Sequence, residues 1–297
     1  MRRRSRRVYV FRLQSNRFDP KLVPGLHPCL RVSVVNVIRM TDELIKRIRR
    51  RTPARVLVDR AGAGYRTATQ LELREAHAAA RDAVRTEFDL IRDLGKELIE
   101  TEKIFQVSTR ASSKDEYLLR PDLGRGFPEQ AAALIQQLCP ASPDLQIVIG
   151  DGLSVTAVAS QVPALLPLIT QLAAERRWSL GRPFAVRYCR VGIMNAVGDL
   201  LKPKVVLLLI GERPGLATAE SLSAYMAFRP RNGDNDAQRN LISNIHERGV
   251  TIEAAAIRIV NLAQTIMTKQ LSGVQVKEAL ESPKWLDQSN GKDKNLK

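Results

Sequence analysis

The pattern of apolar and polar positions changes near residue 145, and the part of the chain before it is mostly helical. Three stretches are rich in alanine, leucine and charged helix formers or begin with a proline that suits a helix start. They predict helices over residues 67–84, 87–102 and 128–139. The polar, irregular segment 109–125 is expected to be a loop. We therefore expect a smaller, mainly helical N-terminal domain over residues 40–140.

After residue 145, short apolar runs alternate with helical stretches. The runs predict strands over residues 145–150, 184–191, 205–210 and 222–228, with a weaker one over 241–246. The helical stretches are residues 155–178, broken by Pro163 and Pro167, a short helix through Leu201, and residues 252–273, which stop at Gly273. This alternation predicts the fold class α/β, with a parallel sheet in a Rossmann-like C-terminal domain over residues 141–273.

A sheet of this kind binds ligands beyond the carboxyl ends of its strands. Three turns are expected at that edge: DGLS after the first strand, the turn at Val191 after the second, and GERPG (residues 211–215) after the third. All three are candidates for a binding site on geometry alone.

The GERPG turn places two opposite charges between two glycines at the end of an apolar strand. One interpretation is an ion pair between Glu212 and Arg213 at the sheet edge, with Pro214 stiffening the turn. The other is a ligand contact, for which Glu212 offers about four acceptor sites and no donor.

The net charge of +16 is concentrated at the N-terminus. Residues 1–51 hold 15 Lys/Arg and 3 Asp/Glu, whereas the rest of the chain holds 32 and 28. A nucleic-acid-binding face would need the excess on the folded body, so we expect no nucleic acid as a partner there. No run reaches the roughly 18 consecutive apolar residues of a membrane-spanning helix, so we expect no membrane span.

Both ends of the chain differ from the body in composition. Residues 1–39 form a basic extension without the apolar core of a secretory signal. Thr41 can cap a short helix after Met40, so we expect Met40 to lie nearer the true start, and the extension to be disordered or the result of a misplaced start. The alternatives are a targeting arm and a nucleic-acid-binding arm. The polar tail, residues 274–297, is expected to be disordered.

The residues offer no catalytic constellation. GDGLSV (150–155) is not the G-x-G-x-x-G of dinucleotide sites, no Walker A or G-x-S-x-G motif occurs, and Asp151 and Ser154 can simply cap the next helix. The cysteines and histidines are scattered, at Cys29, Cys139, Cys189, His27, His77 and His246. They predict neither a disulfide framework nor a metal site, and they indicate a reducing, cytoplasmic setting. We expect a binding subunit with no catalytic residue and no metal ligand.

Seven segments of the chain occur in an order that is typical of one enzyme family. They are TPARVLVDRAGAGYRT (52–67), AHAAARDAV (76–84), TRASSKDEYLLRPDLGR (109–125), IVIGDGLS (147–154), FAVRYCRV (184–191), VVLLLIGERPGLATAESLSAY (205–225) and ISNIHERG (242–249). Together they resemble the small (light) subunit of ethanolamine ammonia-lyase, over about Thr52 to Gly273.

The resemblance implies a function. The enzyme uses adenosylcobalamin to convert ethanolamine to acetaldehyde and ammonia by a radical mechanism. A TIM-barrel large subunit holds the substrate, the small subunit closes over the cobalamin, and six of each chain assemble into a hetero-oligomer. The small subunit is not active alone. In many bacteria the enzyme lies inside a protein-shelled microcompartment of the cytoplasm.

The resemblance also implies which residues contact the cobalamin: Val191, Glu212 and Leu241. Glu212 can accept hydrogen bonds from the amides of the corrin rim, and Val191, at the end of the second strand, can offer backbone groups and pack on the ring. Leu241 stands where some relatives have cysteine, so a backbone contact would survive there and a thiol contact would not. Ala76 replaces an expected aspartate, which weakens any role for His77. No histidine lies in D-x-H-x-x-G, so this chain is not expected to ligate cobalt.

Two other functions stay open on the residues alone. One is a non-catalytic, basic-armed nucleic-acid-binding or shell-binding protein with a degenerate Rossmann domain. The other is a nicotinamide-dependent oxidoreductase, which the missing glycine pattern disfavours. A TIM-barrel partner that co-purifies would separate the ammonia-lyase subunit from both.

Overall fold

The computed structural model of the chain describes residues 42–52, 54–58, 60–215 and 217–278. The extension over residues 1–39, the cap at Thr41 and most of the polar tail lie outside the described residues. The chain divides into two compact units, residues 1–66 and residues 67–297.

The described part of the first unit holds a helix and a small hairpin. Helix α1 (Asp42–Arg50) confirms the short helix expected after residue 40. Arg49 donates hydrogen bonds to the carbonyls of Val56 (3.2 Å) and Leu57 (2.6 Å), which ties the following segment to the helix. Strands β1 (Arg60–Ala61) and β2 (Gly64–Tyr65) pair antiparallel.

The second unit contains the sheet and the helices that cover it. Its helices are α2 (Thr67–Arg85), α3 (Leu90–Leu94), α4 (Lys96–Glu102), α5 (Lys114–Leu119), α6 (Glu129–Leu138), α7 (Val155–Glu175), α8 (Ile193–Leu201) and α9 (Ile252–Lys269), with 3-10 turns η2 (Leu123–Arg125) and η3 (Asp236–Gln238). Its strands are β3 (Phe105–Ser108), β4 (Leu145–Gly150), β5 (Phe184–Arg187), β6 (Val205–Gly211), β7 (Leu222–Phe228) and β8 (Asn240–Ile245). All the strands expected after residue 145 are thus confirmed, most of them within a residue or two of their expected bounds.

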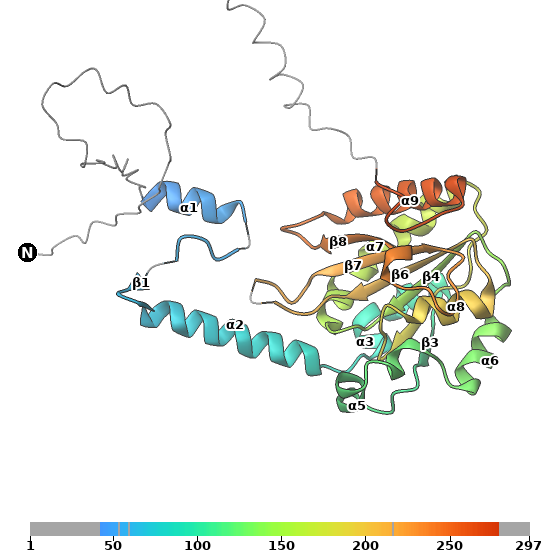
Figure 1. Cartoon of the computed structure of the whole chain (residues 1–297), viewed down its shortest axis with the longest axis horizontal. Helices are drawn as coiled ribbons and strands as arrows, with labels where there is room; N and C mark the ends of the chain where they lie inside the picture. Colours follow the sequence, from blue (N-terminus) through green and yellow to red (C-terminus); the bar gives the residue numbers. More distant parts are fainter. Residues whose placement is uncertain (1–41, 53, 59, 216, 279–297) are drawn as a thin grey trace, which may run out of the picture. The chain divides into compact units, whose positions relative to one another are not determined.

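In the described residues, β3 to β8 form a six-stranded mixed sheet in the order β3-β5-β4-β6-β7-β8 (Figure 1). The first four run parallel, whereas β7 pairs antiparallel with both β6 and β8. The α/β class is confirmed, but the expectation of a parallel sheet is wrong for β7. Parallel neighbours need a crossover of a dozen or more residues, usually a helix. The described residues between β6 and β7, and between β7 and β8, contain no α-helix, so these strands pair antiparallel.

The sheet is covered on both faces. Alternate residues of β6 point to opposite sides, so Leu207 and Leu209 pack with α7 and α9, whereas Leu208 and Ile210 pack with α6 and α8. Figure 1 shows the same helix–sheet–helix layering of this unit. Burial on both faces explains why the β6 sequence is an unbroken apolar run.

Helix α7 is continuous, although it contains Pro163 and Pro167. The expectation that these prolines break the helix is wrong. Each proline removes one backbone N–H and disfavours the helix by about 3 kcal/mol, but Leu165, Leu166 and Ile169 are fully buried in the core beside them, and this packing holds the helix. By length and composition alone α7 could cross a membrane, a test that a core helix also passes.

Two expectations before residue 145 need correction. The segment 109–125 is not a plain loop, because it contains α5 and η2; Ser113 accepts a hydrogen bond from the Glu116 N–H (3.2 Å) and starts α5. Strand β3, which was not expected, pairs with β5. The sheet therefore uses residues from the part expected to be the N-terminal domain, and the domain boundary at residue 140 stays a prediction.

Glycines divide or follow helices at two other places. The stretch 87–102 forms two helices, because Gly95 has a φ of +81° between them. Helix α9 ends at Lys269, with Gln270 in the left-handed region, so Gly273 is not its stop. Gly273 instead has a φ of +88° and lies so close to Ala237 that a side chain would strike the Ala237 carbonyl.

Candidate functional site

The residues expected to contact a cofactor, Val191, Glu212 and Leu241, line one hollow at the carboxyl edge of the sheet. We name it the edge hollow, and its volume is about 430 Å³. Its other walls are Tyr117, Gly152, Leu153, Cys189, Arg190, Ile210, Gly211, Arg213, Ser223, Tyr225 and Ser243. The fold thus brings the three positions together from segments that are far apart in the chain.

The floor of the edge hollow is a partly uncovered face of β7 and β8. On this face Leu241 is 46% exposed and Tyr225 is half-buried. The alternate residues Leu222, Ala224 and Met226 are buried in the core on the other face. Because strand side chains alternate between faces, one side of this hairpin is available to a ligand while the other anchors it.

The sequence placed Val191 at the end of the second strand. In the structure Val191 lies beyond β5, in the segment that follows it. The strand stops at Arg187, and Tyr188 adopts a left-handed φ of +58° that turns the chain. The turn forms because the Asp151 carboxylate accepts hydrogen bonds from the N–H groups of Tyr188 (2.9 Å) and Cys189 (2.8 Å). Asp151 therefore supports the segment that presents Val191.

Asp151 is buried and has a cationic partner. The Nζ of Lys114 lies 3.6 Å from its Oδ2, and the two side chains are 7% and 1% exposed. Burial raises the pKa of Asp151, whereas the Lys114 ammonium and the backbone N–H groups act in the opposite direction. Tyr117, fully buried beside Lys114, donates a hydrogen bond to the Cys189 carbonyl (2.8 Å). The turn after β5 is thus held from both sides.

The first and third turns approach each other through two glycines. Gly152 has a φ of +58°, which only glycine adopts readily, and the Leu153 N–H donates to the Gly211 carbonyl (3.1 Å). A Cβ on Gly211 would strike the Ser154 carbonyl and lie 2.9 Å from that of Asp151. The first glycine of GERPG is therefore required by close backbone packing.

Glu212 is held in place by the protein and keeps room for a ligand. Its carboxylate accepts hydrogen bonds from the hydroxyls of Ser221 (2.9 Å) and Ser223 and from the Asn244 N–H (3.3 Å). A carboxylate has about four acceptor sites, so one site is left for a ligand. Three of the four acceptor sites are thus occupied by the protein before anything binds.

Arg213 and Tyr225 supply donors to the same hollow. Arg213 is exposed and forms no ion pair with any described residue, so the expected alternative of a Glu212–Arg213 pair is wrong. Burial raises the pKa of Tyr225, and the negative charge of Glu212 adds to this effect. The Tyr225 hydroxyl therefore stays protonated near neutral pH and can donate.

The remaining candidates from the sequence have structural positions. Ser154 caps α7 by accepting a hydrogen bond from the Ala157 N–H (3.2 Å). His246 is buried after β8, with its backbone bonded to Val250. His77 is exposed on α2. Within the described residues no group of three or more His, Cys, Asp or Glu side chains gathers at one place.

We expect Cys139 and Cys189 to resist alkylation in the folded chain. Both are buried; burial raises the pKa of Cys139 to about 11 and that of Cys189 well above its ordinary value. At pH 8 iodoacetamide should leave both thiols unmodified in the native protein and modify both in urea, as read by peptide mass spectrometry. Labelling of native Cys139 should rise as the pH approaches 11, and rapid labelling at pH 8 would contradict this.

The comparison with known families decides where the chain belongs. The model of the ethanolamine ammonia-lyase light chain matches residues 42–277, which include all residues of the edge hollow. The chain belongs to the ethanolamine ammonia-lyase light-chain family. The resemblance inferred from seven short segments is thereby confirmed.

Individual members of the light-chain family cover most of this chain. It is 43% identical to the ethanolamine ammonia-lyase small subunit of Clostridium perfringens over 227 residues, 76% of this chain and 75% of the relative. It is 38% identical to the small subunit of Clostridium acetobutylicum over 245 residues, 82% and 99% of the two chains. It is 40% identical to the small subunit of Listeria monocytogenes over 232 residues, 78% and 77%.

The light-chain fold also reveals residues that the sequence did not single out. Lys114 and Tyr117 lie in the segment 109–125, which pattern alone assigned to a loop, yet they are buried beneath the edge hollow. Arg190 lines the edge hollow together with Tyr117, with its guanidinium 4.3 Å from the Tyr117 ring centroid. A lysine and a tyrosine spaced three residues apart in a polar segment indicate one helical face, and this was the available signal.

Proposed function

We propose that this chain is the small subunit of an adenosylcobalamin-dependent ethanolamine ammonia-lyase, which converts ethanolamine to acetaldehyde and ammonia. The single observation that carries the proposal is that Val191, Glu212 and Leu241 meet in the edge hollow. The light-chain family match supports the same function. A large subunit would hold the substrate, and this chain would contribute no catalytic side chain and no metal ligand.

The chemistry of the edge hollow fits the rim of a corrin. That rim carries neutral amides, which need both donors and acceptors, and a buried amide left unpaired costs about 1–3 kcal/mol. Glu212 has one acceptor site left, Tyr225 is a protonated donor, and no described residue accepts a hydrogen bond from the Val191 N–H. Leu241 offers an exposed apolar side chain for the ring. The Nε of Arg190 is buried without a hydrogen-bond partner in the described part of the chain, as expected of a site that a polar ligand completes.

The proposed role of this chain is closure over the cofactor. When bound, adenosylcobalamin supplies radical chemistry, which requires a site that excludes water and oxidants. The α/β unit, Rossmann-like in this proposal, would cover the cobalamin held by the large subunit. The proposed assembly contains six copies of each chain. It would be cytoplasmic, and inside a protein-shelled microcompartment in organisms that build one.

Reconstitution tests the function directly. The full chain is co-expressed with its TIM-barrel large subunit, and the purified complex is assayed for acetaldehyde release from ethanolamine. We expect release only when both chains and adenosylcobalamin are present. Activity of the large subunit alone at the same level, or no co-purification of the two chains, would overturn the proposal.

Glu212→Ala should weaken cobalamin binding without unfolding the chain. A hydrogen bond to a charged group contributes about 1.5–3 kcal/mol, so we expect a loss of affinity of roughly 10-fold or more. Equilibrium dialysis of the reconstituted complex with cyanocobalamin measures it, and thermal unfolding checks the fold. Glu220→Ala, an exposed acid in the same loop, is the matched control and should bind normally. Equal affinities for the two variants would defeat the assignment.

A further inference from the structure

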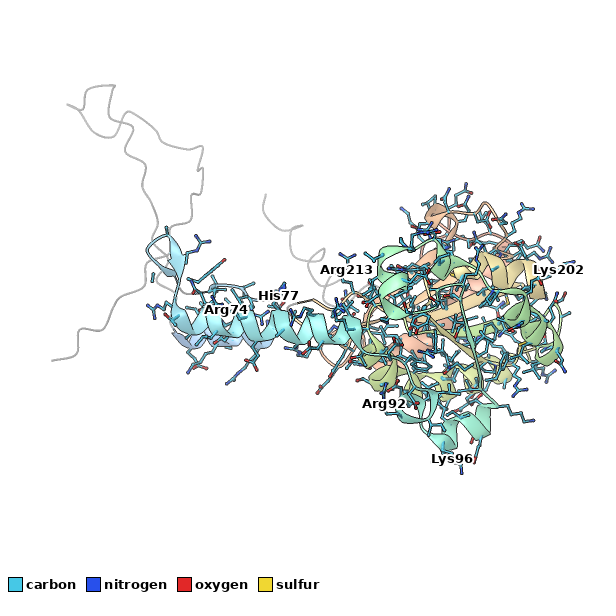
Figure 2. All side chains as sticks on the ribbon, turned by 90° about the horizontal axis from the view of Figure 1, so that it is seen from below. Arg74, His77, Arg92, Lys96, Lys202 and Arg213 are labelled. Carbon is cyan, nitrogen blue, oxygen red and sulfur yellow. The ribbon has the colours of Figure 1, made fainter. Side chains whose placement is uncertain are left out.

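A second hollow adjoins the edge hollow and is strongly cationic. We name it the arginine hollow; it has a volume of about 460 Å³. Arg81 and His77 of α2, Arg190 and Arg213 line it, and none of its described lining residues is a carboxylate. In Figure 2, His77 lies along the long helix α2, and Arg213 lies close to the end of this helix that meets the α/β core.

The three arginines of the arginine hollow differ from their neighbours in having no acidic partner among the described residues. Close by in the structure, Arg85 pairs with Asp115, Arg187 with Glu87 and Arg120 with Asp122. Arg81, Arg190 and Arg213 form no such pair. Uncompensated positive charge therefore gathers in the arginine hollow, where it attracts an anion.

Arg190 is the fixed member of the group. Its guanidinium lies on the Tyr117 ring, 4.3 Å from the centroid, and its Nη2 donates a long hydrogen bond to the Tyr117 carbonyl (3.4 Å). Its Nε is buried and has no hydrogen-bond partner among the described residues. Arg190 also lines the edge hollow, as do Arg213 and Leu153. The two hollows therefore adjoin each other at these shared residues.

We propose that the arginine hollow binds the phosphodiester of the cobalamin's nucleotide tail, an inference that rests on the proposed function of the edge hollow. The tail is linked to the corrin rim, so a ring in the edge hollow leaves its phosphodiester beside the ring. A phosphodiester carries one negative charge at neutral pH, and a guanidinium stays charged and donates in a fork that fits phosphate oxygens. An unpaired Nε beside two exposed guanidiniums matches this ligand.

Two corrinoids separate the phosphodiester from the ring. Cyanocobalamin contains the nucleotide tail, whereas dicyanocobinamide lacks the phosphodiester, ribose and base. The test compares their dissociation constants by equilibrium dialysis and visible absorbance, with no turnover involved. The protein is the full complex with the large subunit, carrying Arg81→Gln, Arg213→Gln or both. Both side chains are exposed, so the substitutions leave the fold intact.

We expect Arg81→Gln to weaken cyanocobalamin binding by roughly 10-fold and to leave dicyanocobinamide binding unchanged, since a hydrogen bond to a charged group is lost. Arg213→Gln, whose side chain also lines the edge hollow, should weaken cyanocobalamin binding more than dicyanocobinamide binding. Arg74→Gln is the matched control: Arg74 is exposed on α2 and does not line the arginine hollow (Figure 2). It should change neither constant. Added salt should weaken cyanocobalamin binding to the wild-type complex more than to the double variant.

Three results would overturn the inference. If the arginine variants lose the same affinity for both corrinoids, the guanidiniums do not bind the phosphodiester of the nucleotide tail. If the arginine variants fail to co-purify with the large subunit when no corrinoid is present, the guanidiniums instead pair with carboxylates of the large subunit. A wild-type complex that binds neither corrinoid would overturn the proposed function and this inference with it, whereas the first two results leave the proposed function standing.

Discussion

The Asp151→Ala variant should lose about 3–5 kcal/mol of unfolding free energy, because it removes one member of a buried ion pair and leaves the other uncompensated. The Lys114 ammonium would keep only the Gly152 carbonyl (3.5 Å) and the Tyr117 ring near it. The N–H groups of Tyr188 and Cys189 would also lose their acceptor. Urea unfolding of the full chain, followed by circular dichroism, measures the loss.

Two further variants make the Asp151 result specific. Asp82→Ala removes an exposed acid of α2 and should change the unfolding free energy by less than about 0.5 kcal/mol. The double variant Asp151→Ala, Lys114→Met should be more stable than Asp151→Ala alone, because no buried charge is left unpaired. If Asp151→Ala unfolds at the wild-type urea concentration, the buried pair does not hold the turn after β5.

Of the two glycines of the GERPG turn, only Gly211 should lose stability when replaced by alanine. Gly211→Ala places a methyl group against the Ser154 and Asp151 carbonyls. Both contacts are with backbone atoms, which cannot rotate away. We therefore expect the free energy of unfolding to fall by about 1–3 kcal/mol or more, as for an overpacked core. The β6 end and the DGLS turn must then separate, and cobalamin affinity of the reconstituted complex should fall as well.

Gly215→Ala is the matched control in the same turn. A Cβ on Gly215 would meet nothing closer than the Ala217 nitrogen at 4.0 Å. Its unfolding free energy should therefore equal that of the wild type within about 0.5 kcal/mol. Thermal and urea unfolding curves measure the stability of both glycine variants. Equal effects at the two glycines would contradict the close approach of the first and third turns.

Local pattern was sufficient for most elements after residue 145. The apolar run of β6 is a strong signal, because burial on both faces of the sheet leaves an unbroken run of apolar residues in the sequence. Weak signals failed where packing overrides propensity. The prolines of α7 were expected to break a helix that the core holds together, and β3 is only four residues long.

The candidate site was predictable in part. The motifs named Val191, Glu212 and Leu241, and the sheet brings all three to one hollow. The residues that support this hollow were not predictable, because Asp151 and Lys114 are 37 positions apart and no local pattern links them. Neither could pattern show that Arg81 and Arg190 share a second hollow. Such pairs depend on tertiary contacts alone.

The sequence by itself determined the α/β class, the strands and helices around the ligand edge, and membership of the light-chain family. These follow from periodicity, from turn residues and from the order of the motifs, all of which are local in the chain. Only the tertiary structure decided that β7 runs antiparallel, that Glu212 keeps one acceptor site, and that three arginines without an acidic partner among the described residues gather beside the edge hollow. Strand partners, hydrogen-bond saturation and charge compensation are relations between distant residues, and the packed chain alone sets them.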